Sequence, residues 1–320
     1  MKNKTKVALV QDSSVPFDAE KTTEKAIALI AQCASNGAEL AVFPEAFLGT
    51  YPKGLTFDAP VGTRLPEGRE DYYRYYEGAV TLDGTEVQKL TDAAAEHHIF
   101  VVMGVIERLG TTLYCSVIFI DPAEGLVNIR RKLMPTGSER LIWGFGDGST
   151  LKVVESSIGK IGAVICWENY MPALRAAMYA QGVEIYCAPT ADDRESWLSS
   201  MRHIAMEGRC FVLSACQHIT RGEYGENYRS VLHADSNDVV MKGGSVVVGP
   251  LGEIIAGPVF DEKTIIYAEL DKETLIRSKL DFDPVGHYAR PDVLSINVDT
   301  TRKSAVCFHA SPSLPHQNGY

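Results

Sequence analysis

Long apolar runs are missing from this chain of 320 residues. Its longest apolar stretches, such as Ile99–Ile106, are far shorter than the roughly 20 residues that a membrane-spanning helix needs. The first residues, MKNKTKVALVQDS, carry lysines but neither an extended apolar stretch nor a small-residue cleavage site of the kind that a secretory signal has. We therefore expect no membrane span and a cytoplasmic protein.

Cysteine patterns that indicate disulfide bonds or zinc binding are also absent. The seven cysteines are odd in number, and no Cys-x-x-Cys motif occurs. Cys115, Cys187, Cys210 and Cys216 lie inside apolar strand-like runs. For Cys187, Cys210 and Cys216 we expect small buried side chains, because free cysteine is among the most buried residue types. This usage argues against a disulfide scaffold and a zinc ribbon.

Clustered basic residues are scarce as well. The net charge is −10 and the longest Lys/Arg run is Arg130–Lys132, whereas phosphate backbones bind to a clustered basic face. The histidines lack metal-ligand spacing, and the glycine-rich segment 144–148 is not followed by the Gly-Lys-Ser/Thr of a phosphate-binding loop. We expect no nucleic-acid partner, no metal and no cofactor.

Strand-like and helix-like patterns alternate along the chain without a linker or a short-period repeat. We therefore predict a single α/β domain over residues 1–300, followed by an irregular tail over 301–320. Strands are expected at Lys6–Gln11, Glu39–Phe43, Ile99–Arg108, Thr112–Asp121, Leu126–Lys132, Leu151–Glu155, Lys160–Cys166, Val183–Ala188, Cys210–Gln217, Ser245–Val248, Glu253–Ala256 and Thr264–Leu270. Helices are expected from a cap at Asp18 to Asn36, as a pair over 70–97, at Asn169–Gln181 and Arg194–Gly208, and from Asp271. The long connection 44–70, rich in Gly and Pro, is expected to shape a site.

Cys166 has the position of a nucleophile. It ends an apolar strand and precedes the predicted helix that opens Trp167-Glu168-Asn169-Tyr170. The N–H groups and the positive dipole end of a helix N-terminus favour a thiolate over a thiol.

Two charged residues also stand at strand ends. Glu45 lies among apolar and aromatic residues, and desolvation there should raise its pKa toward that of a general base or acid. Lys132 closes a strand, although a lysine in such a basic triplet is more often a solvated surface charge. Because open α/β proteins place their sites at the carboxyl ends of strands, we expect Glu45, Lys132 and Cys166 to converge at one edge of a sheet.

The order and context of these three residues resemble the Glu-Lys-Cys triad of the nitrilase superfamily of carbon–nitrogen hydrolases. The likeness extends over Phe43–Phe47, Tyr51–Gly54, Arg131–Thr136, Cys166–Pro172 and Met201–Gln217, which are similar to the nitrilase branch itself. It implies a four-layer α-β-β-α sandwich, which the strand and helix pattern alone does not distinguish from a doubly wound sheet. It also implies subunits that pair across a helical face into a homo-oligomer, either a dimer or a spiral of dimers. Glu139, on its own an exposed loop charge, matches a second glutamate of the family with a catalytic or lysine-orienting role.

The resemblance implies a nitrilase that converts an organic nitrile to the carboxylic acid and ammonia through a covalent intermediate on Cys166. Tyr51, Trp167 and Thr190 are the expected substrate contacts, Thr190 because its turn follows a strand end. Alternatives are an amidase or a hydratase activity on the same triad, a catalytically silent assembly scaffold, and a redox protein. An intact Glu-Lys-Cys set opposes the scaffold, and the lack of a neighbouring resolving cysteine opposes redox chemistry. The sequence leaves the identity of the nitrile open.

Overall fold

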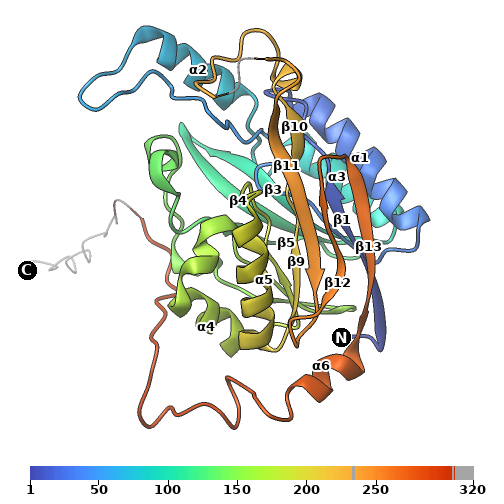
Figure 1. The fold of residues 1–320 in the computed structure, drawn as a ribbon. Coiled ribbons are helices and arrows are strands. Elements are labelled where there is room, and N and C mark those ends of the chain that lie inside the picture. Colours follow the sequence, from blue (N-terminus) through green and yellow to red (C-terminus); the bar gives the residue numbers. More distant parts are fainter. Residues whose placement is uncertain (233–234, 305, 307–320) are drawn as a thin grey trace, which may run out of the picture.

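Two β-sheets lie face to face, and helices cover the outer side of each, so the chain forms four layers (Figure 1). The computed structural model describes residues 1–232, 235–304 and 306. The predicted α-β-β-α sandwich is confirmed. Of the predicted tail, residues 301–304 contain neither helix nor strand, and residues 305 and 307–320 lie outside the described residues.

Both sheets are mixed. In the first, the strand order is β13 (Thr264–Asp271), β1 (Lys4–Gln11), β2 (Leu40–Val42), β3 (Phe100–Leu109), β4 (Thr112–Asp121) and β5 (Gly125–Arg131). In the second, the order is β10 (His218–Thr220), β11 (Val239–Val248), β9 (Phe211–Ser214), β8 (Ile185–Cys187), β7 (Gly159–Ala163) and β6 (Val154–Ser156), with β12 (Ile254–Phe260) also paired to β11.

The side chains of each strand point alternately to the two faces of its sheet, and apolar side chains on both faces explain why both faces are covered. In β1, Val7 and Leu9 pack into the space between the two sheets, whereas Ala8 and Val10 pack toward the outer helices. Successive side chains of a strand point to opposite faces, so a strand that is apolar at every position requires cover on both sides. The layers thus enclose one central core and two outer cores.

The outer helices come from opposite halves of the sequence. The first sheet is covered by α1 (Ala19–Ser35) and α3 (Thr85–Glu96), and the second by α4 (Pro172–Ala180) and α5 (Glu195–Gly208). The predicted cap of α1 is confirmed, because the carboxylate of Asp18 accepts a hydrogen bond from the Lys21 N–H at 2.9 Å. The remaining helices are α2 (Pro66–Glu77) and α6 (Lys272–Ser278). No helix in the described ranges is long and apolar enough to cross a bilayer.

Several predicted boundaries were wrong. The helix expected at Asn169–Gln181 is a 3₁₀ turn, η3 (Cys166–Tyr170), followed by α4, because Pro172 occupies the first turn of the α-helix and separates the two. Likewise α2 begins at Pro66, inside the expected connection. The strand before Cys166 ends at Ala163, and the short strand β10 was not predicted.

Candidate active site

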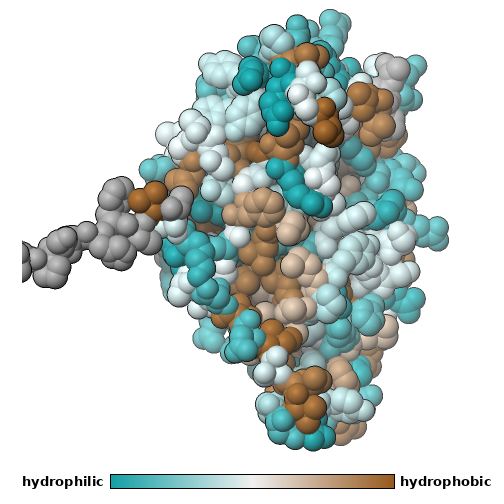
Figure 2. Space-filling view, turned by 90° about the vertical axis from the view of Figure 1, so that its left-hand side faces the viewer, coloured by the Kyte–Doolittle hydropathy of each residue, from teal (hydrophilic) through white to brown (hydrophobic). Residues whose placement is uncertain are grey.

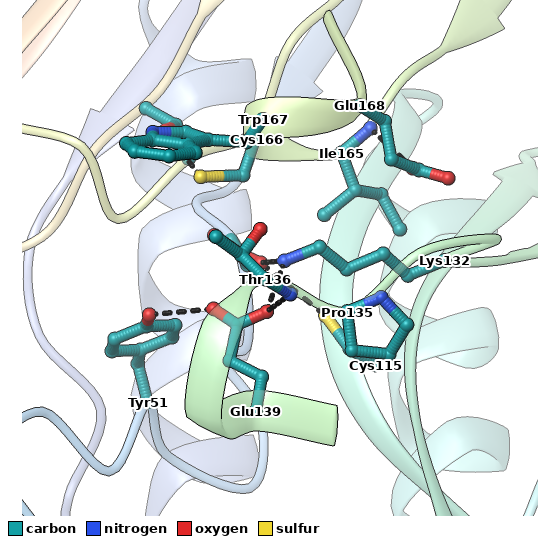
Figure 3. A network of polar contacts seen from close by, with 12 residues as sticks. Tyr51, Cys115, Lys132, Pro135, Thr136, Glu139, Ile165, Cys166, Trp167 and Glu168 are labelled. Carbon is teal, nitrogen blue, oxygen red and sulfur yellow. Dashed lines mark hydrogen bonds and ion pairs between the residues drawn. The ribbon is translucent and has the colours of Figure 1, made fainter. Parts of the chain in front are cut away.

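Three chain segments that follow strand ends meet between the two sheets (Figure 3). Glu45 follows β2 and Lys132 follows β5, both in the first sheet, whereas Cys166 follows β7 in the second. The expectation that all three converge at an edge of one sheet was therefore wrong. The carboxyl ends of two facing sheets build the site, and sequence pattern alone does not show which strands share a sheet.

Lys132 is the centre of the polar network. Its ammonium group donates to Glu45 Oε1 at 2.7 Å and to Glu139 Oε2 at 2.7 Å, and its side chain is fully buried. Burial lowers the pKa of Lys132, but the surrounding acidic groups, Glu45 first among them, raise it well above its usual range. The ammonium group therefore stays charged at neutral pH.

Glu45 keeps one carboxylate oxygen without a protein partner. Oε1 receives the Lys132 ammonium and lies 3.6 Å from Cys115 Sγ, whereas the buried Oε2 forms no hydrogen bond among the described residues. Burial raises the pKa of the Glu45 carboxyl, and the Lys132 charge opposes this shift only in part. Both features suit a general base, as the sequence indicated.

A glycine makes room for the Glu45 backbone. A Cβ atom on Gly104 of β3 would lie 2.2 Å from Pro44 O and 2.7 Å from Glu45 Cα. The Gln217 amide holds the same segment by donating to Glu45 O at 3.0 Å. The Glu45 backbone thus packs against β3 of the first sheet and is held by the side chain of Gln217, which lies between β9 and β10 of the second sheet.

Cys166 adopts a strained backbone conformation, with φ at 49° in the left-handed region that non-glycine residues rarely occupy. Its N–H donates to Pro189 O at 2.9 Å, and the Thr190 hydroxyl donates to its Sγ at 3.2 Å. In Figure 3 the sulfur points into the space that the Lys132 ammonium also faces. The side chain is thereby held at the bottom of a cleft.

The expected preference of Cys166 for the thiolate was wrong. Burial and then the Glu45 carboxylate raise the pKa of the thiol far above its ordinary value, and Lys132 opposes this shift only in part. The short turn η3 takes the place of the longer helix that was expected to stabilise the anion. Cys166 at rest is therefore a thiol, and it would need a base to act as a nucleophile.

Glu139 is mostly buried and not the exposed loop charge that it resembles in the sequence. It lies in the 3₁₀ turn η1 (Gly137–Leu141), where its Oε2 accepts the Thr136 N–H at 2.6 Å as well as the Lys132 ammonium. Its Oε1 accepts the Tyr51 hydroxyl at 2.7 Å. Glu139 therefore orients Lys132, and Tyr51 orients Glu139 (Figure 3).

A cleft of about 300 Å³ opens over Cys166. Its walls include Tyr51 and Trp167, two of the expected substrate contacts, and Lys53 from the long connection that was expected to shape a site. Thr190 is fully buried and does not line this cleft, and its hydroxyl donates to Cys166 Sγ. No group of metal-ligating side chains is present in the described part of the chain.

The family model described as carbon-nitrogen hydrolase matches residues 6–279. The chain belongs to the carbon–nitrogen hydrolase family. A nitrilase of Bradyrhizobium diazoefficiens is 57% identical over 95% of each chain, and an aliphatic nitrilase of Sinorhizobium fredii is 52% identical over 96% of this chain and 99% of its own. A bifunctional nitrilase/nitrile hydratase of Nicotiana tabacum is 48% identical over 96% of this chain and 90% of its own.

Solved carbon–nitrogen hydrolases share the fold. The Helicobacter pylori G27 carbon-nitrogen hydrolase superposes with a TM-score of 0.71 at 20% identity, covering 91% of this chain and 96% of that one. Saccharomyces cerevisiae Nit3, a member of the nitrilase superfamily, gives 0.68 at 22% identity, covering 89% and 97%.

Sequence reasoning missed two residues of this carbon–nitrogen hydrolase site. Cys115 was expected only to lie inside an apolar strand, yet it contacts Glu45. The pairing of β4 with β5 places Cys115 beside Lys132, and this pairing is the signal that could have found it. Asp192 is the second of these residues. Its carboxylate accepts the Trp167 indole N–H at 2.8 Å and the Arg194 N–H at 3.1 Å, so it fixes a wall of the cleft beside the start of α5.

Proposed function

We propose that this chain hydrolyses an organic nitrile to the carboxylic acid and ammonia, with Cys166 as the nucleophile. The observation that carries the proposal is a thiol at the bottom of a cleft, beside a buried lysine that two glutamates share. The nitrilase relatives, at up to 57% identity over nearly the whole chain, support nitriles as the substrates.

The first half of the reaction forms a covalent thioimidate. Glu45 removes the Cys166 proton through its unpartnered Oε2, and the sulfur bonds to the nitrile carbon. The electron pair of one of the three bonds between the nitrile carbon and nitrogen moves to the nitrogen, which then takes the proton from Glu45. Formation of the S–C bond needs no cofactor.

The second half releases ammonia and then the acid. Water, deprotonated by Glu45, adds to the thioimidate carbon, and ammonia leaves after its nitrogen is protonated, which gives a thioester. A second water hydrolyses the thioester and returns the proton to Cys166. The Lys132 ammonium and the backbone N–H of Trp167, in the first turn of η3, stabilise the tetrahedral centres. Glu139 holds Lys132 in place.

Paired nitrile and amide substrates test the activity. An amide brings N–H donors that a nitrile lacks, and each of these that a site built for a linear nitrile leaves unpaired costs about 1–3 kcal/mol. We expect kcat/KM for a short aliphatic nitrile to exceed that for its matching amide by roughly tenfold to a hundredfold. The acid should be the main product, with the amide as a minor product of the shared tetrahedral intermediate.

The measurement quantifies ammonia, acid and amide with the wild type and with Cys166→Ala as the control. Cys166→Ala should fold and retain less than about a tenth of the wild-type rate. A preference for the amide substrate would make the enzyme an amidase. Amide as the dominant product would make it a hydratase, a second candidate that the bifunctional relative from Nicotiana tabacum favours.

We also propose that the enzyme is a homo-oligomer that pairs across the face carrying α4. A groove of about 950 Å³ runs there between α4 and the segment 284–302, and exposed apolar residues of that segment, Leu294 and Ile296 among them, lie beside it. Figure 2 shows apolar side chains on this side of the molecule. Sedimentation should give a species larger than the 35.0 kDa monomer, and a fully active monomer would contradict the pairing.

A further inference from the structure

One buried carboxylate connects the segment that carries the nucleophile to the segment that carries the lysine. Glu168 Oε2 accepts the Ile165 N–H at 3.1 Å, immediately before Cys166. Its Oε1 accepts the Leu133 N–H at 2.5 Å, immediately after Lys132, and the Arg130 guanidinium at 2.9 Å. Both Glu168 and Arg130 are 1% exposed. These bonds cross from the second sheet to the first.

We propose that Glu168 is a positioning residue that sets the separation between Cys166 and the Lys132–Glu45 pair. This proposal rests on the proposed function, because it concerns the same nucleophile and base. The two segments belong to different sheets, so ladder hydrogen bonds within a sheet do not fix their distance. A carboxylate that accepts a backbone N–H from each does so directly, and the Arg130 charge fixes the carboxylate.

The other side of η3 is held differently. The Asn169 amide donates to Val164 O at 2.9 Å and Cys166 O at 2.8 Å, and its Oδ1 accepts the Tyr186 hydroxyl at 2.9 Å. Tyr186 belongs to β8, so Asn169 ties the turn to its own sheet. Glu168 supplies the tie to the opposite sheet, in the direction along which the Cys166 proton travels to Glu45.

A neighbouring ion pair provides the matched control. Glu107 is also 1% exposed and accepts from Arg131 Nε at 2.9 Å, from Arg131 Nη2 at 2.5 Å and from the Ser116 hydroxyl at 2.9 Å. All three of these residues belong to β3, β4 and β5 of the first sheet, and none bonds to the turn that carries Cys166. Loss of this carboxylate therefore disturbs a buried charge without changing a contact between the sheets.

The experiment compares Glu168→Gln, Glu168→Asp and Glu107→Gln by Tm, by kcat and KM for a nitrile, and by the rate at which iodoacetamide alkylates Cys166. Both Gln variants should lower Tm, because each leaves an arginine without its carboxylate. Glu168→Gln should lower kcat by about a hundredfold with KM nearly unchanged, which is the order of loss that a displacement of about 1 Å produces. It should also slow alkylation of Cys166, since the thiol then lies farther from its base.

Glu168→Asp keeps the charge beside Arg130 but is shorter by one methylene, so it should fold better than Glu168→Gln and still lose roughly tenfold in kcat. Glu107→Gln should keep kcat and the alkylation rate within about twofold of the wild type. If Glu168→Gln does not fold, Glu168→Asp decides alone. Unchanged kcat and alkylation in a folded Glu168 variant, or an equal loss in Glu107→Gln, would overturn the proposal. Alkylation needs no nitrile, so it still tests Glu168 if the wild type fails to hydrolyse nitriles.

Discussion

The consecutive basic residues Arg130, Arg131 and Lys132 each contact a buried carboxylate, but the contacts differ in completeness. Glu168 and Glu107 use both oxygens, the former for Arg130 and two backbone N–H groups, the latter for Arg131 and a hydroxyl. Glu45 uses Oε1 for Lys132 and leaves the buried Oε2 unpartnered beside Cys166. All three carboxylates are buried, so burial alone does not mark the one proposed to be catalytic.

An unsatisfied buried oxygen costs stability, and native proteins rarely keep one without a functional reason. Among these three carboxylates, the free oxygen belongs to Glu45, whose partner Lys132 also contacts Glu139 next to the cleft. Glu168 and Glu107 are therefore carboxylates that join segments, whereas Glu45 is a carboxylate that is free to take a proton.

The largest expected difference is between Lys132→Met and Arg131→Met. Lys132→Met removes the charge that stabilises the tetrahedral centres and should lower kcat/KM by a factor on the order of 10²–10³. Arg131→Met leaves Glu107 buried without its cation and should lower Tm, yet each folded molecule should retain most of its activity. Steady-state kinetics normalised to the folded fraction measures both. Similar losses in the two variants would show that buried charge of any kind supports activity.

A smaller effect is expected from Glu139→Gln. The Glu139 charge is one of the causes that raise the pKa of Glu45, and Glu45 must be deprotonated to act as the base. In the wild type, kcat/KM should fall below a pH that lies above the usual glutamate pKa of about 4.3. Glu139→Gln removes a like charge, so this acid limb should move to lower pH, while kcat at the plateau falls because Lys132 loses an anchor. A pH profile of kcat/KM measures the shift; an acid limb that stays in place would assign it to another group.

Local patterns predicted the strand ends that carry the candidate site, whereas the four layers were predicted from the resemblance to a family. A short continuous apolar run locates β1, and Asp18 caps α1 within its own first turn. The sequence did not predict that Cys166 comes from a different sheet than Glu45, or that the Thr190 hydroxyl donates to the Cys166 sulfur. Those facts depend on contacts between distant parts of the chain, which propensity and spacing do not encode.

The cysteine chemistry shows the same limit. The prediction of a thiolate at Cys166 used only the adjacent turn, whereas burial and Glu45, both tertiary features, raise the pKa of that thiol. The desolvation of Glu45 was predictable from its apolar neighbours in the sequence, because they stay beside it in the fold. Neighbours in the sequence thus predict the direction of a pKa shift only where the same residues also surround the group in the fold.

The smallest expected effect is that of Cys115→Ala, which tests whether the contact on Oε1 also tunes the base. The thiol of Cys115 lies 3.6 Å from Glu45 Oε1 and is a weak donor. Loss of a donor to the carboxylate favours its protonated form, so the acid limb of kcat/KM should move to slightly higher pH, opposite in sign to the shift in Glu139→Gln. Lys132 and the free Oε2 are untouched, so the plateau kcat should stay within about threefold of the wild type, and Tm should fall modestly because the cavity left by the sulfur is small. Cys187→Ala, a buried cysteine in β8, provides the control for cavity formation without the Glu45 contact. A loss of plateau kcat as large as that of Lys132→Met would show that Oε1 requires the thiol to hold the base in place, and the division of Glu45 into one paired and one free oxygen would then be wrong.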